Sequence, residues 1–500
     1  MYRVDSGSFA ELSTPKGDPV SDTTLDRRQF YINGSWVDPV IANDFDVIDP
    51  SNEEVCAVIS LGGEADTNAA VAAAKAAFPA WAATPVEERI EKLEKLAEIY
   101  KARASEMAAA ITAEMGAPHD MSATQQVGAG IGHIKSIIRA LKEFEFDRPL
   151  GDHAPDNEIL YEPVGVAALI TPWNWPMNQV TLKVIPAIGV GCTMVLKPSE
   201  IAPLSGSLFA DMIHEAGFPP GVFNMVHGDG VGVGTQLSGH PDVDMVSFTG
   251  STRAGVAITK NAADSVKRVA LELGGKGANI VFADAGEKAV DWGVKRCFNN
   301  TGQSCNAPTR MLVERSIYDE TVEKAKAAAA KVAVGDPTEE GRHIGPVVSE
   351  TQWNKIQGLI AKGEQEGARL VAGGQGRPDG FDKGYYVKPT VFVDVDPDMT
   401  ISREEIFGPV LAITPFDTEE EAIALANDTP YGLTNYVQTT DKDKARRVAR
   451  QLRSGMVEMN GMARGAGAPF GGYGQSGNGR EGGEWGIEEF LEVKSVTGWN

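Results

Sequence analysis

The sequence predicts an α/β protein built on doubly wound, mostly parallel sheets, because short apolar strands alternate with helical stretches over most of its length. The alternation is clearest between residues 164 and 275, where apolar runs at 164–171 and 193–197 are each followed by a helical stretch. Glycine and polar residues gather directly after several of these runs. Parallel sheets bind ligands beyond the carboxyl ends of their strands, so a small-molecule site is expected there.

Before that region the pattern favours a hairpin and several helices. Residues 30–37 form two short predicted strands with Asn33 and Gly34 at the turn. Residues 64–80 are rich in alanine and predict a helix, and a further helix is expected over about 121–146. We interpret these helices as packing scaffold.

One long helix is expected between those two. Thr84 can cap its start, Pro85 suits the first turn and Glu87 completes a capping box. Apolar residues keep helical spacing from Ile90 onward, and Gly116 ends the run.

A break rich in proline and glycine at 147–163 precedes the first α/β region, and a second α/β region begins near residue 278. A glycine-rich loop at 461–474 leads into the C-terminal segment. The strands expected besides those above are 159–161, 222–226, 245–249, 268–273, 279–282, 310–314, 390–395 and 411–415, and the later helices are 319–332, 419–426 and 444–453.

Composition limits the functional classes. The chain of 500 residues carries a net charge of −23, which disfavours nucleic acids and anionic membranes as partners. No apolar run approaches the about 20 residues of a membrane span, and residues 1–26 are polar and predict a loose tail. The four cysteines lack CxxC spacing and the seven histidines form no ligand cluster, so no disulfide framework or metal site is indicated and a reducing, cytoplasmic compartment is expected.

One cysteine lies in a setting that suits chemistry. Cys305 belongs to the polar, glycine-containing stretch 299–310, with Gln303, Ser304 and Asn306 around it. Donors in such a loop would stabilise a thiolate, which suits a partly accessible nucleophile. An ordinary loop cysteine is the alternative that these residues alone leave open.

Other informative residues follow predicted strands. Residues 248–255 pass from a strand through Gly250 into a helix, and a helix N-terminus attracts phosphate. Lys197 and Glu200 could hydrogen-bond a ribose, and Glu272 precedes two glycines that permit close approach. Each feature has a plain structural alternative, a helix start or a solvated loop, and the GxGxxG dinucleotide fingerprint is absent after the first strand.

In combination these motifs resemble the NAD(P)-dependent aldehyde dehydrogenase superfamily. They occur in the family's order over about residues 30–496. The matching motifs are PWNWP at 172–176, KPSE at 197–200, FTGST at 248–252, LELGGK at 271–276, GQSC at 302–305, EEIFGPV at 404–410, and PFGG with SGNGRE within 469–481. The resemblance implies two Rossmann-like, doubly wound α/β domains and a small β oligomerisation element.

The resemblance also implies a reaction. Cys305 would attack an aldehyde, and Asn174 with the Cys305 backbone N–H would hold the alkoxide. Hydride would pass to NAD, and Glu272 would activate the water that releases the acid. Glu200 would repel a 2′-phosphate, so NAD is expected in preference to NADP, and no metal is required. The family's cofactor contacts fall on Thr171, Pro172, Trp173, Lys197, Ser199, Glu200, Gly230, Phe248, Gly250, Ser251, Leu273, Gly274, Glu405 and Phe407.

Substrate contacts are implied in the same way. The chain looks most like the bacterial branch that oxidises medium-chain and ω-oxo-acid aldehydes such as 6-oxohexanoate. Arg464 lies among small residues without a carboxylate nearby in sequence, so it is either a solvated surface residue or a binder of a distal carboxylate. The implied contacts are Trp175, Met177, Asn178, Ser304, Arg464 and Phe470, with Lys183 and Glu481 as further polar residues of the active site.

Two rival functions remain open at this point. A CoA-acylating semialdehyde dehydrogenase would share the nucleophile, but a hydrolytic base such as Glu272 is unwanted there. A binding or structural protein on the same fold should have lost Cys305, Glu272 or Asn174. All three are present, so an oxidoreductase that makes the free acid is expected.

The domain organisation is likewise an expectation from the resemblance. The NAD-binding domain comprises 27–146 and 165–275, the catalytic domain 276–462, and the substrate-entrance loop 463–481. Residues 147–164 and 482–500 form an oligomerisation element, which favours a homotetramer over a dimer. The chain departs from the family at Gly474, where lysine is frequent.

Overall fold

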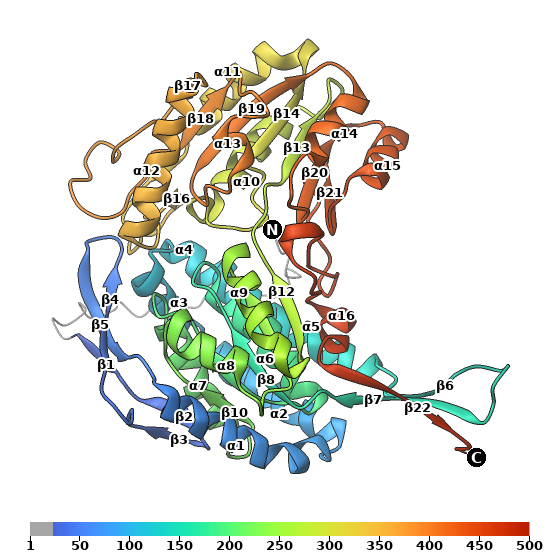
Figure 1. Ribbon diagram of the computed structural model, residues 1–500. Coiled ribbons are helices and arrows are strands. Elements are labelled where there is room, and N and C mark those ends of the chain that lie inside the picture. The colour runs from blue at the N-terminus through green and yellow to red at the C-terminus, as the bar shows by residue number, and fades with distance from the viewer. Residues whose placement is uncertain (1–23, 500) are drawn as a thin grey trace.

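Two lobes and a projecting arm make up residues 24–499, the part of the chain that the computed structural model describes (Figure 1). Each lobe is built around a seven-stranded sheet, and a three-stranded sheet runs along the arm. We call the lobe that contains the N-terminal half of the described chain the first lobe and the other the second lobe. This arrangement confirms the predicted α/β class.

The first lobe's sheet has the strand order β12-β11-β8-β9-β10-β2-β3. Its first five strands are parallel, and β2 and β3 form the predicted hairpin at one edge. Asn33 and Gly34 turn the hairpin with φ angles of 50° and 79°, which asparagine and glycine adopt readily. The strands are β2 (Phe30–Ile32), β3 (Ser35–Val37), β8 (Val166–Ile170), β9 (Thr193–Lys197), β10 (Phe223–Met225), β11 (Met245–Thr249) and β12 (Arg268–Glu272).

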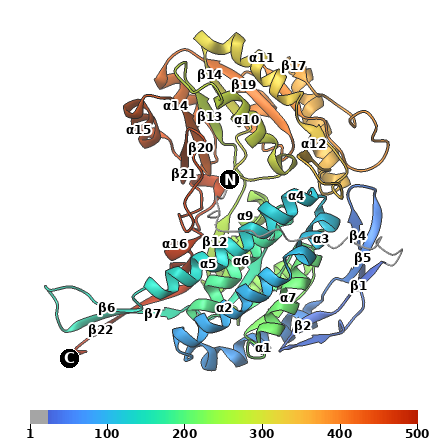
Figure 2. The same ribbon diagram turned by 180° about the vertical axis from the view of Figure 1, so that it is seen from behind.

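Helices cover both faces of this sheet. Successive side chains of β8 point to opposite faces and all are apolar and buried, so both faces need a cover. They are α1 (Glu64–Ala82), α2 (Val86–Ala102), α3 (Ala104–Met115), α4 (His119–Met121), α5 (Val127–Glu143), α6 (Pro176–Val190), α7 (Leu204–Ala216), α8 (Thr235–Gly239) and α9 (Thr252–Ala262). Val166, Ala168 and Ile170 pack into one core with α1, α8 and α9. Ala167 and Leu169 pack into another with α2, α5, α6 and α7, which Figure 2 shows from behind.

The second lobe repeats the plan with the strand order β17-β18-β19-β14-β13-β20-β21. All neighbouring pairs are parallel except β17 with β18. Its strands are β13 (Ala278–Val281), β14 (Arg310–Glu314), β17 (Arg369–Ala372), β18 (Thr390–Val393), β19 (Val410–Phe416), β20 (Thr434–Gln438) and β21 (Met456–Met459). Its helices are α10 (Ala289–Phe298), α11 (Tyr318–Ala329), α12 (Glu350–Gln365), α13 (Thr400–Arg403), α14 (Glu419–Asn427) and α15 (Lys442–Gln451), with the small strands β15 (Ala333–Val334) and β16 (His343–Ile344).

The expected long helix is wrong, because the structure divides it into α2 and α3 at Arg103, where φ is −102° and ψ is 21°. The capping box at its start is also wrong. Thr84 donates its hydroxyl to the Ala80 carbonyl at 3.0 Å and so belongs to the end of α1, and Pro85 is the first flanking residue of α2. Gly116 does end the run, with a left-handed φ of 71°.

Two further expectations need correction. The helix expected over about 121–146 is α4, a π-helical turn at Ser122–Gln126 and α5. The last residues of the expected tail are in fact part of a strand, β1 (Leu25–Arg27). This strand pairs with one edge of β5 (Glu54–Ser60), and β4 (Asp44–Asp49) pairs with the other edge of β5. Residues 1–23 of that tail lie outside the described residues.

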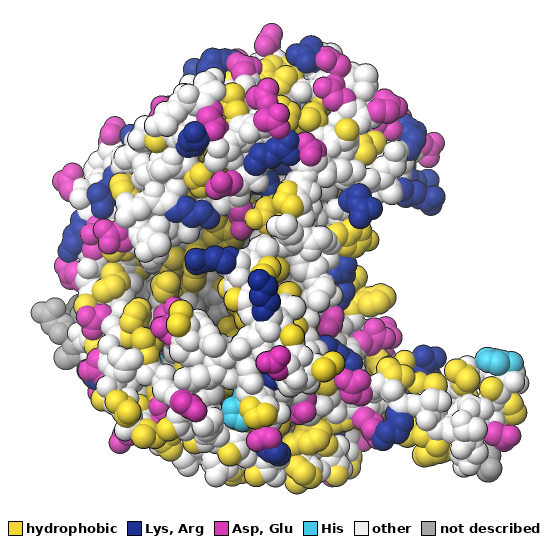
Figure 3. All heavy atoms as spheres, in the orientation of Figure 1, with side chains coloured by type: hydrophobic (Ala, Val, Ile, Leu, Met, Phe, Trp, Pro, Cys, Tyr) yellow, Lys and Arg dark blue, Asp and Glu magenta, His cyan; other side chains and the backbone are white. Residues whose placement is uncertain are grey.

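The arm is an antiparallel sheet of β6 (Asp147–Pro149), β7 (Asn157–Pro163) and β22 (Leu491–Thr497). The short helix α16 (Gly483–Glu488) comes directly before β22 in the chain. The strand expected at 159–161 is the middle of β7. Apolar side chains show on its surface in Figure 3, which also shows a hollow between the two lobes. Leu150, Val493 and Trp499 are among the exposed ones.

Within residues 24–499 no helix is both long and apolar enough to cross a bilayer. The four cysteines are free thiols. Neither finding by itself assigns the protein to a compartment.

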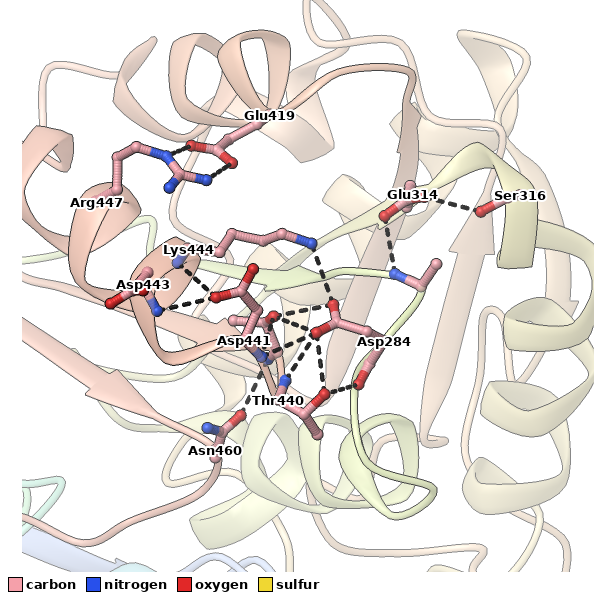
Figure 4. Close-up of polar contacts among 12 residues, drawn as sticks. Asp284, Glu314, Ser316, Glu419, Thr440, Asp441, Asp443, Lys444, Arg447 and Asn460 are labelled. Atoms are coloured by element: carbon pink, nitrogen blue, oxygen red, sulfur yellow. Dashed lines mark hydrogen bonds and ion pairs between the residues drawn. The ribbon is translucent and has the colours of Figure 1, made fainter.

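One carboxylate ties the second lobe's sheet to α15. Asp284 follows β13, and its oxygens accept hydrogen bonds from the Thr439 hydroxyl at 2.7 Å and from the Thr440 and Asp441 backbone N–H groups at 3.0 Å (Figure 4). Lys444 lies 3.3 Å away. Burial acts to raise the pKa of Asp284, but hydrogen bonds from Thr439, Asp441 and Thr440 outweigh it and hold the pKa well below its usual range.

We expect Asp284→Asn to lower the free energy of unfolding by about 1–3 kcal/mol at neutral pH, because several bonds to a charged acceptor are weakened. The shift in a urea denaturation midpoint measures it. Asp443→Asn is the matched control, since that side chain lies at the same helix start and is 89% exposed. Equal midpoints for the two variants would contradict the assigned role.

Candidate active site

Loops from both lobes meet where the chain crosses from β12 to β13, and glycines permit their close approach. A Cβ added to Gly275 would come within 2.6 Å of the Cys305 carbonyl, and one added to Gly274 within 2.3 Å of a Glu405 carboxyl oxygen. A Cβ on Gly471 would come within 2.7 Å of Glu272 Oε1. These contacts explain why the sequence needs glycine at positions flanked by functional side chains.

The loop before Cys305 has a strained backbone. Asn300, Thr301 and Gly302 have φ angles of 54°, 55° and 72°, all in the left-handed region. A β-branched residue is rarely found there, so the surroundings must impose the conformation. Thr301 Oγ1 donates to the Gly345 carbonyl at 3.0 Å, and a Cβ on Gly302 would lie only 2.1 Å from the Gly408 carbonyl oxygen.

Gln303 fixes the loop to its neighbours. Its Oε1 accepts a hydrogen bond from the Val348 N–H at 2.9 Å, and its carbonyl accepts one from Asn174 Nδ2 at 3.0 Å. The Asn174 carbonyl in turn accepts one from Asn300 Nδ2 at 2.8 Å. The predicted donor Asn174, which is 4% exposed, therefore lies directly beside the nucleophile loop.

Cys305 is partly buried and partly exposed. Burial raises the pKa of the Cys305 thiol to about 12, with further contributions from the negative charges of Glu405 and Glu272, against the Asn306 backbone N–H. The sequence predicted a thiolate stabilised by nearby donors. The structure differs because burial and two carboxylates outweigh the one donor, so the neutral thiol is the resting form.

Glu272, at the end of β12, is 3% exposed, and neither carboxyl oxygen has a hydrogen-bond partner among the described residues. It borders a small cavity that is also lined by Ser247, Gly479, Arg480 and Glu481. Burial, and then the charge of Glu481, raise the pKa of Glu272 well above its usual value. A carboxylate with a raised pKa is a stronger base toward a nearby water molecule.

Lys183 and Glu481 form a buried ion pair beside that cavity. Lys183 Nζ lies 2.5 Å from Glu481 Oε1 and donates to the Ser247 hydroxyl at 3.2 Å. Phe470 and Glu481 exchange two backbone hydrogen bonds of 2.8 Å, which fixes the glycine-rich loop over the site. Both predicted polar residues thus lie close to Glu272.

The predicted ribose-binding residues converge after β9. Lys197 Nζ donates to Glu200 Oε2 at 3.1 Å, to the Pro198 carbonyl at 3.0 Å and to the Gly228 carbonyl. Thr171 donates its N–H to the Lys197 carbonyl at 3.1 Å, which joins the ends of β8 and β9. Ser199 is buried, and its hydroxyl accepts a hydrogen bond from the Ile201 N–H at 3.3 Å.

The predicted phosphate-binding turn has the form of a helix start. Ser251 caps α9, and its hydroxyl accepts the Ala254 N–H at 3.3 Å. Gly250 packs on the Phe248 ring, where an added Cβ would come within 2.4 Å, whereas Gly230 has open space around it.

Two exposed valines near these turns were not identified from the sequence. Val231 is 85% exposed beside Gly230, and Val256 is 48% exposed on α9. Uncovered apolar side chains at the edge of a polar site suit the flat face of an aromatic ring.

The nicotinamide-side residues of the prediction are also together. Glu405 Oε1 accepts the Gly275 N–H at 2.8 Å. The Phe407 ring meets the Trp173 ring edge to face, with centroids 5.5 Å apart. Leu273 lies on the same crossing segment, held by a bond from its N–H to the Ser476 carbonyl at 2.9 Å, and Pro172 precedes Trp173 in the loop after β8.

The residues expected around the substrate divide into two groups. Trp175 donates its indole N–H to the Ser304 hydroxyl at 2.8 Å and so lies beside the nucleophile loop, whereas Asn178 Oδ1 lies 2.8 Å from Nε2 of His133 on α5. Met177 has no exposed surface and packs within the core of the first lobe, so its expected substrate contact lacks support.

The expectation that Arg464 has no carboxylate nearby is wrong. Glu458, six positions earlier on β21, places Oε1 3.9 Å from Arg464 Nε and is itself mostly buried. The Arg464 guanidinium also lies 4.7 Å above the Phe470 ring. Arg464 therefore turns toward the site, but part of its charge is already balanced.

Known proteins share this architecture. The aldehyde dehydrogenase family model matches residues 36–496. The chain belongs to the aldehyde dehydrogenase family. This membership confirms the resemblance that the motifs indicated.

Individual relatives cover nearly the whole enzyme. A 3-succinoylsemialdehyde-pyridine dehydrogenase of a Pseudomonas species is 51% identical over 476 residues, 95% of this chain and 99% of that one. A crystal structure of an aldehyde dehydrogenase from Bartonella henselae is 58% identical, covers 95% of this chain and 100% of that one, and has a TM-score of 0.94. Aldehyde dehydrogenase C from Pseudomonas syringae, a cysteine-to-alanine mutant in complex with NAD⁺ and octanal, is 47% identical with a TM-score of 0.93 over 95% of this chain and 97% of that one.

Between residues 24 and 499, no group of three or more His, Cys, Asp or Glu side chains could hold a metal ion. Several residues that shape the site have no motif of their own and were not identified from the sequence. They are Ser247, Gln352, Lys355 and Glu458, together with His133.

The raised pKa of Cys305 predicts a particular pH response. Without added cofactor, its rate of alkylation by iodoacetamide should rise about tenfold per pH unit from about pH 6 to about pH 9 without levelling off, because the thiolate is the reactive form. Mass spectrometry of the Cys305 peptide follows the reaction, and Cys305→Ala identifies the site. A plateau near pH 8 would show that the thiol is more acidic than its surroundings imply.

Proposed function

We propose that this enzyme, an NAD-dependent aldehyde dehydrogenase, oxidises medium-chain aldehydes to free acids through a thioester on Cys305 that Glu272-activated water hydrolyses. One observation carries the proposal. Glu272 is a buried carboxyl group without a hydrogen-bond partner among the described residues, it borders a cavity, and its charge acts on the Cys305 thiol. A general base needs that freedom to take a proton from water.

The attack step depends on Cys305 and Asn174. The Cys305 thiol is neutral at rest, so its proton must leave as the sulfur bonds to the aldehyde carbon. Glu272 is the acceptor that we assign, since its raised pKa matches that task. Asn174 uses one amide hydrogen on the Gln303 carbonyl, which leaves the other for the alkoxide oxygen. One such donor is typically worth about 10²–10³ in rate.

Release of the acid uses the same base a second time, after Glu272 has passed the thiol proton on toward the Lys183–Glu481 pair at the edge of the cavity. Bound NAD⁺ supplies the hydride acceptor that turns the adduct into a thioester. Glu272 then takes a proton from a water molecule, whose oxygen attacks the thioester carbon and returns Cys305 to its free form. The proton can pass on toward the Lys183–Glu481 pair at the edge of the cavity. CoA-acylating chemistry is disfavoured because this carboxyl group would hydrolyse the thioester.

Several features of the chain suit NAD as the cofactor. Gly230 has open space around it, the neighbouring Val231 exposes an apolar face, and Gly274 leaves room beneath Glu405. Lys197 and Glu200 would meet the adenosine ribose. NAD is favoured over NADP, because the Glu200 carboxylate would repel a 2′-phosphate. Two like unit charges about 4 Å apart repel by about 4 kcal/mol at an effective dielectric of about 20.

The aldehyde itself is assigned by class. The solved Pseudomonas syringae relative holds octanal, and the Pseudomonas relative is named for a pyridine-bearing semialdehyde. Neither name carries a distal carboxylate. Glu458 already balances part of the charge of Arg464, so we favour uncharged medium-chain aldehydes over ω-oxo acids.

We also propose a homo-oligomer, preferably a tetramer, in a reducing, cytoplasmic setting. The arm extends β7 and β22 away from both lobes (Figure 1), and Val493 on it is 62% exposed. An apolar surface of this kind is stable in water when a second copy covers it. The four free thiols agree with the compartment.

Loss of the nucleophile and loss of the base should have different effects. Cys305→Ala should abolish NADH formation from octanal and leave the NAD⁺ dissociation constant nearly unchanged. Glu272→Gln should keep NAD⁺ binding and lower steady-state turnover by about 10²-fold or more. NADH absorbance and calorimetric titration measure the two quantities.

Controls separate the rival functions. Adding CoA to wild-type enzyme should not change the product from octanoate, which chromatography detects. Formation of octanoyl-CoA would favour the acylating alternative, and no NADH from any aldehyde of a panel would favour the inactive one. Unchanged turnover in Glu272→Gln would remove that residue from the mechanism.

Arg464→Ala tests the substrate class. We expect the Michaelis constants for octanal and for an ω-carboxylated aldehyde of equal length to change alike, within about twofold. A carboxylate held by a guanidinium would be worth about 1.5–3 kcal/mol, or roughly 10- to 150-fold. A selective loss of that size for the carboxylated aldehyde, absent in the exposed control Arg453→Ala, would restore the ω-oxo-acid assignment.

A further inference from the structure

Phe407 has an unusual backbone for a large side chain. Its φ angle is 61°, in the left-handed region that bulky residues rarely adopt. Such a conformation persists only where the surroundings determine it, and it is typical of residues that a site needs in one orientation. The contacts that impose this conformation on Phe407 are therefore candidates for a role in the active site.

One helix supplies those surroundings. Gln352, in the first turn of α12, donates its side-chain amide to the Ile406 carbonyl at 3.1 Å and to the Phe407 carbonyl at 2.9 Å. Lys355, one turn later, donates to the Glu405 carbonyl at 2.8 Å. Three consecutive carbonyls are thus fixed from one face of α12. Gln352 is half-buried whereas Lys355 is exposed, so water competes less with the glutamine bonds.

The loop fixed in this way faces the reaction centre. The Phe407 ring packs on Trp173, and the Glu405 carboxylate accepts the Gly275 N–H. The next residue, Gly408, is pressed against Gly302 in the nucleophile loop. A shift of the Phe407 backbone would therefore move both side chains that face the cofactor's reactive end in the proposed function.

The segment leading into α12 also holds the nucleophile loop. The Gly345 carbonyl accepts the Thr301 hydroxyl at 3.0 Å, and the Val348 N–H donates to Gln303 Oε1 at 2.9 Å. Residues 345–355 therefore bond to two strained loops, one at each partner of hydride transfer. The bonds to each loop come from different residues, so they can be broken separately.

We propose that Gln352 is a positioning residue that holds Phe407 and Glu405 against the nicotinamide end of NAD, and that it acts on cofactor binding and hydride transfer without affecting the reactivity of Cys305. The inference rests on the proposed function for the identity of the hydride acceptor. A purely structural glutamine would instead affect folding and both loops together. The two alternatives differ in the rate at which the Cys305 thiol of the cofactor-free enzyme is alkylated.

Gln352→Ala tests the proposal in the full-length enzyme. We expect the NAD⁺ dissociation constant, measured by calorimetry, to rise about 5- to 10-fold and the first-turnover rate of NADH formation from octanal to fall about 10-fold or more, since small misplacements are costly. Without cofactor, alkylation of Cys305 by iodoacetamide should stay within about twofold of wild type. Gln365→Ala, an exposed glutamine at the end of the same helix, is the matched control and should match wild type in all three measurements.

A second variant isolates the hydrogen bonds. Gln352→Glu keeps the size of the side chain but cannot donate at neutral pH, so it should reproduce the losses of Gln352→Ala. Wild-type binding and hydride transfer in either variant would overturn the proposal. So would equal falls in hydride transfer and alkylation with a lowered melting temperature, which would show a general structural role. Failure of the proposed function itself is separate, because wild-type enzyme would then form no NADH while binding and alkylation remain measurable.

Discussion

The site depends on a backbone constraint beside the nucleophile. Three consecutive residues, Asn300, Thr301 and Gly302, have left-handed φ angles, and Gly302 lies so close to the Gly408 carbonyl that no side chain fits between. This contact fixes the Cys305 loop relative to the loop of Glu405 and Phe407. The two loops precede β14 and β19, which are neighbouring strands in the second lobe's sheet. The strain that a threonine adds is offset by bonds that would otherwise be unnecessary, such as that from Thr301 to Gly345.

The same constraint explains why the site needs two lobes. Glu272 ends a strand of the first sheet, and Cys305 precedes a strand of the second, so neither lobe alone brings base and nucleophile together. The glycine-rich crossing between them lets the Glu405 and Cys305 segments approach the backbone closely. Burial then sets the proton chemistry, because it raises the pKa values of both Cys305 and Glu272, which keeps the thiol protonated at rest and makes the Glu272 carboxylate a stronger base.

The sequence predicted the class of fold, and it identified candidate reacting groups, because both leave local signals. The apolar runs of β9, β11 and β14 match their predicted bounds, and Cys305, Glu272 and Asn174 lie in specific motifs. β20 was missed because Thr434, Asn435 and Gln438 look polar, although their neighbours satisfy them inside the lobe. The break between α2 and α3 at Arg103 and the contacts of Gln352 depend on tertiary packing, so the sequence did not reveal them. The contact between Arg464 and the Glu458 carboxylate depends on how the loop after β21 folds back, and it was missed for the same reason.

The central claim is that Cys305 carries the acyl group and Glu272 from the other lobe releases it. Its most direct test is a trapped intermediate. Glu272→Gln enzyme is mixed with NAD⁺ and octanal, quenched in acid after one turnover and digested for mass spectrometry. An octanoyl thioester on the Cys305 peptide, in an amount that matches the NADH formed and absent from wild type treated alike, is the predicted result. NADH without an acyl adduct, or an adduct on Cys56, Cys192 or Cys297, would contradict the account.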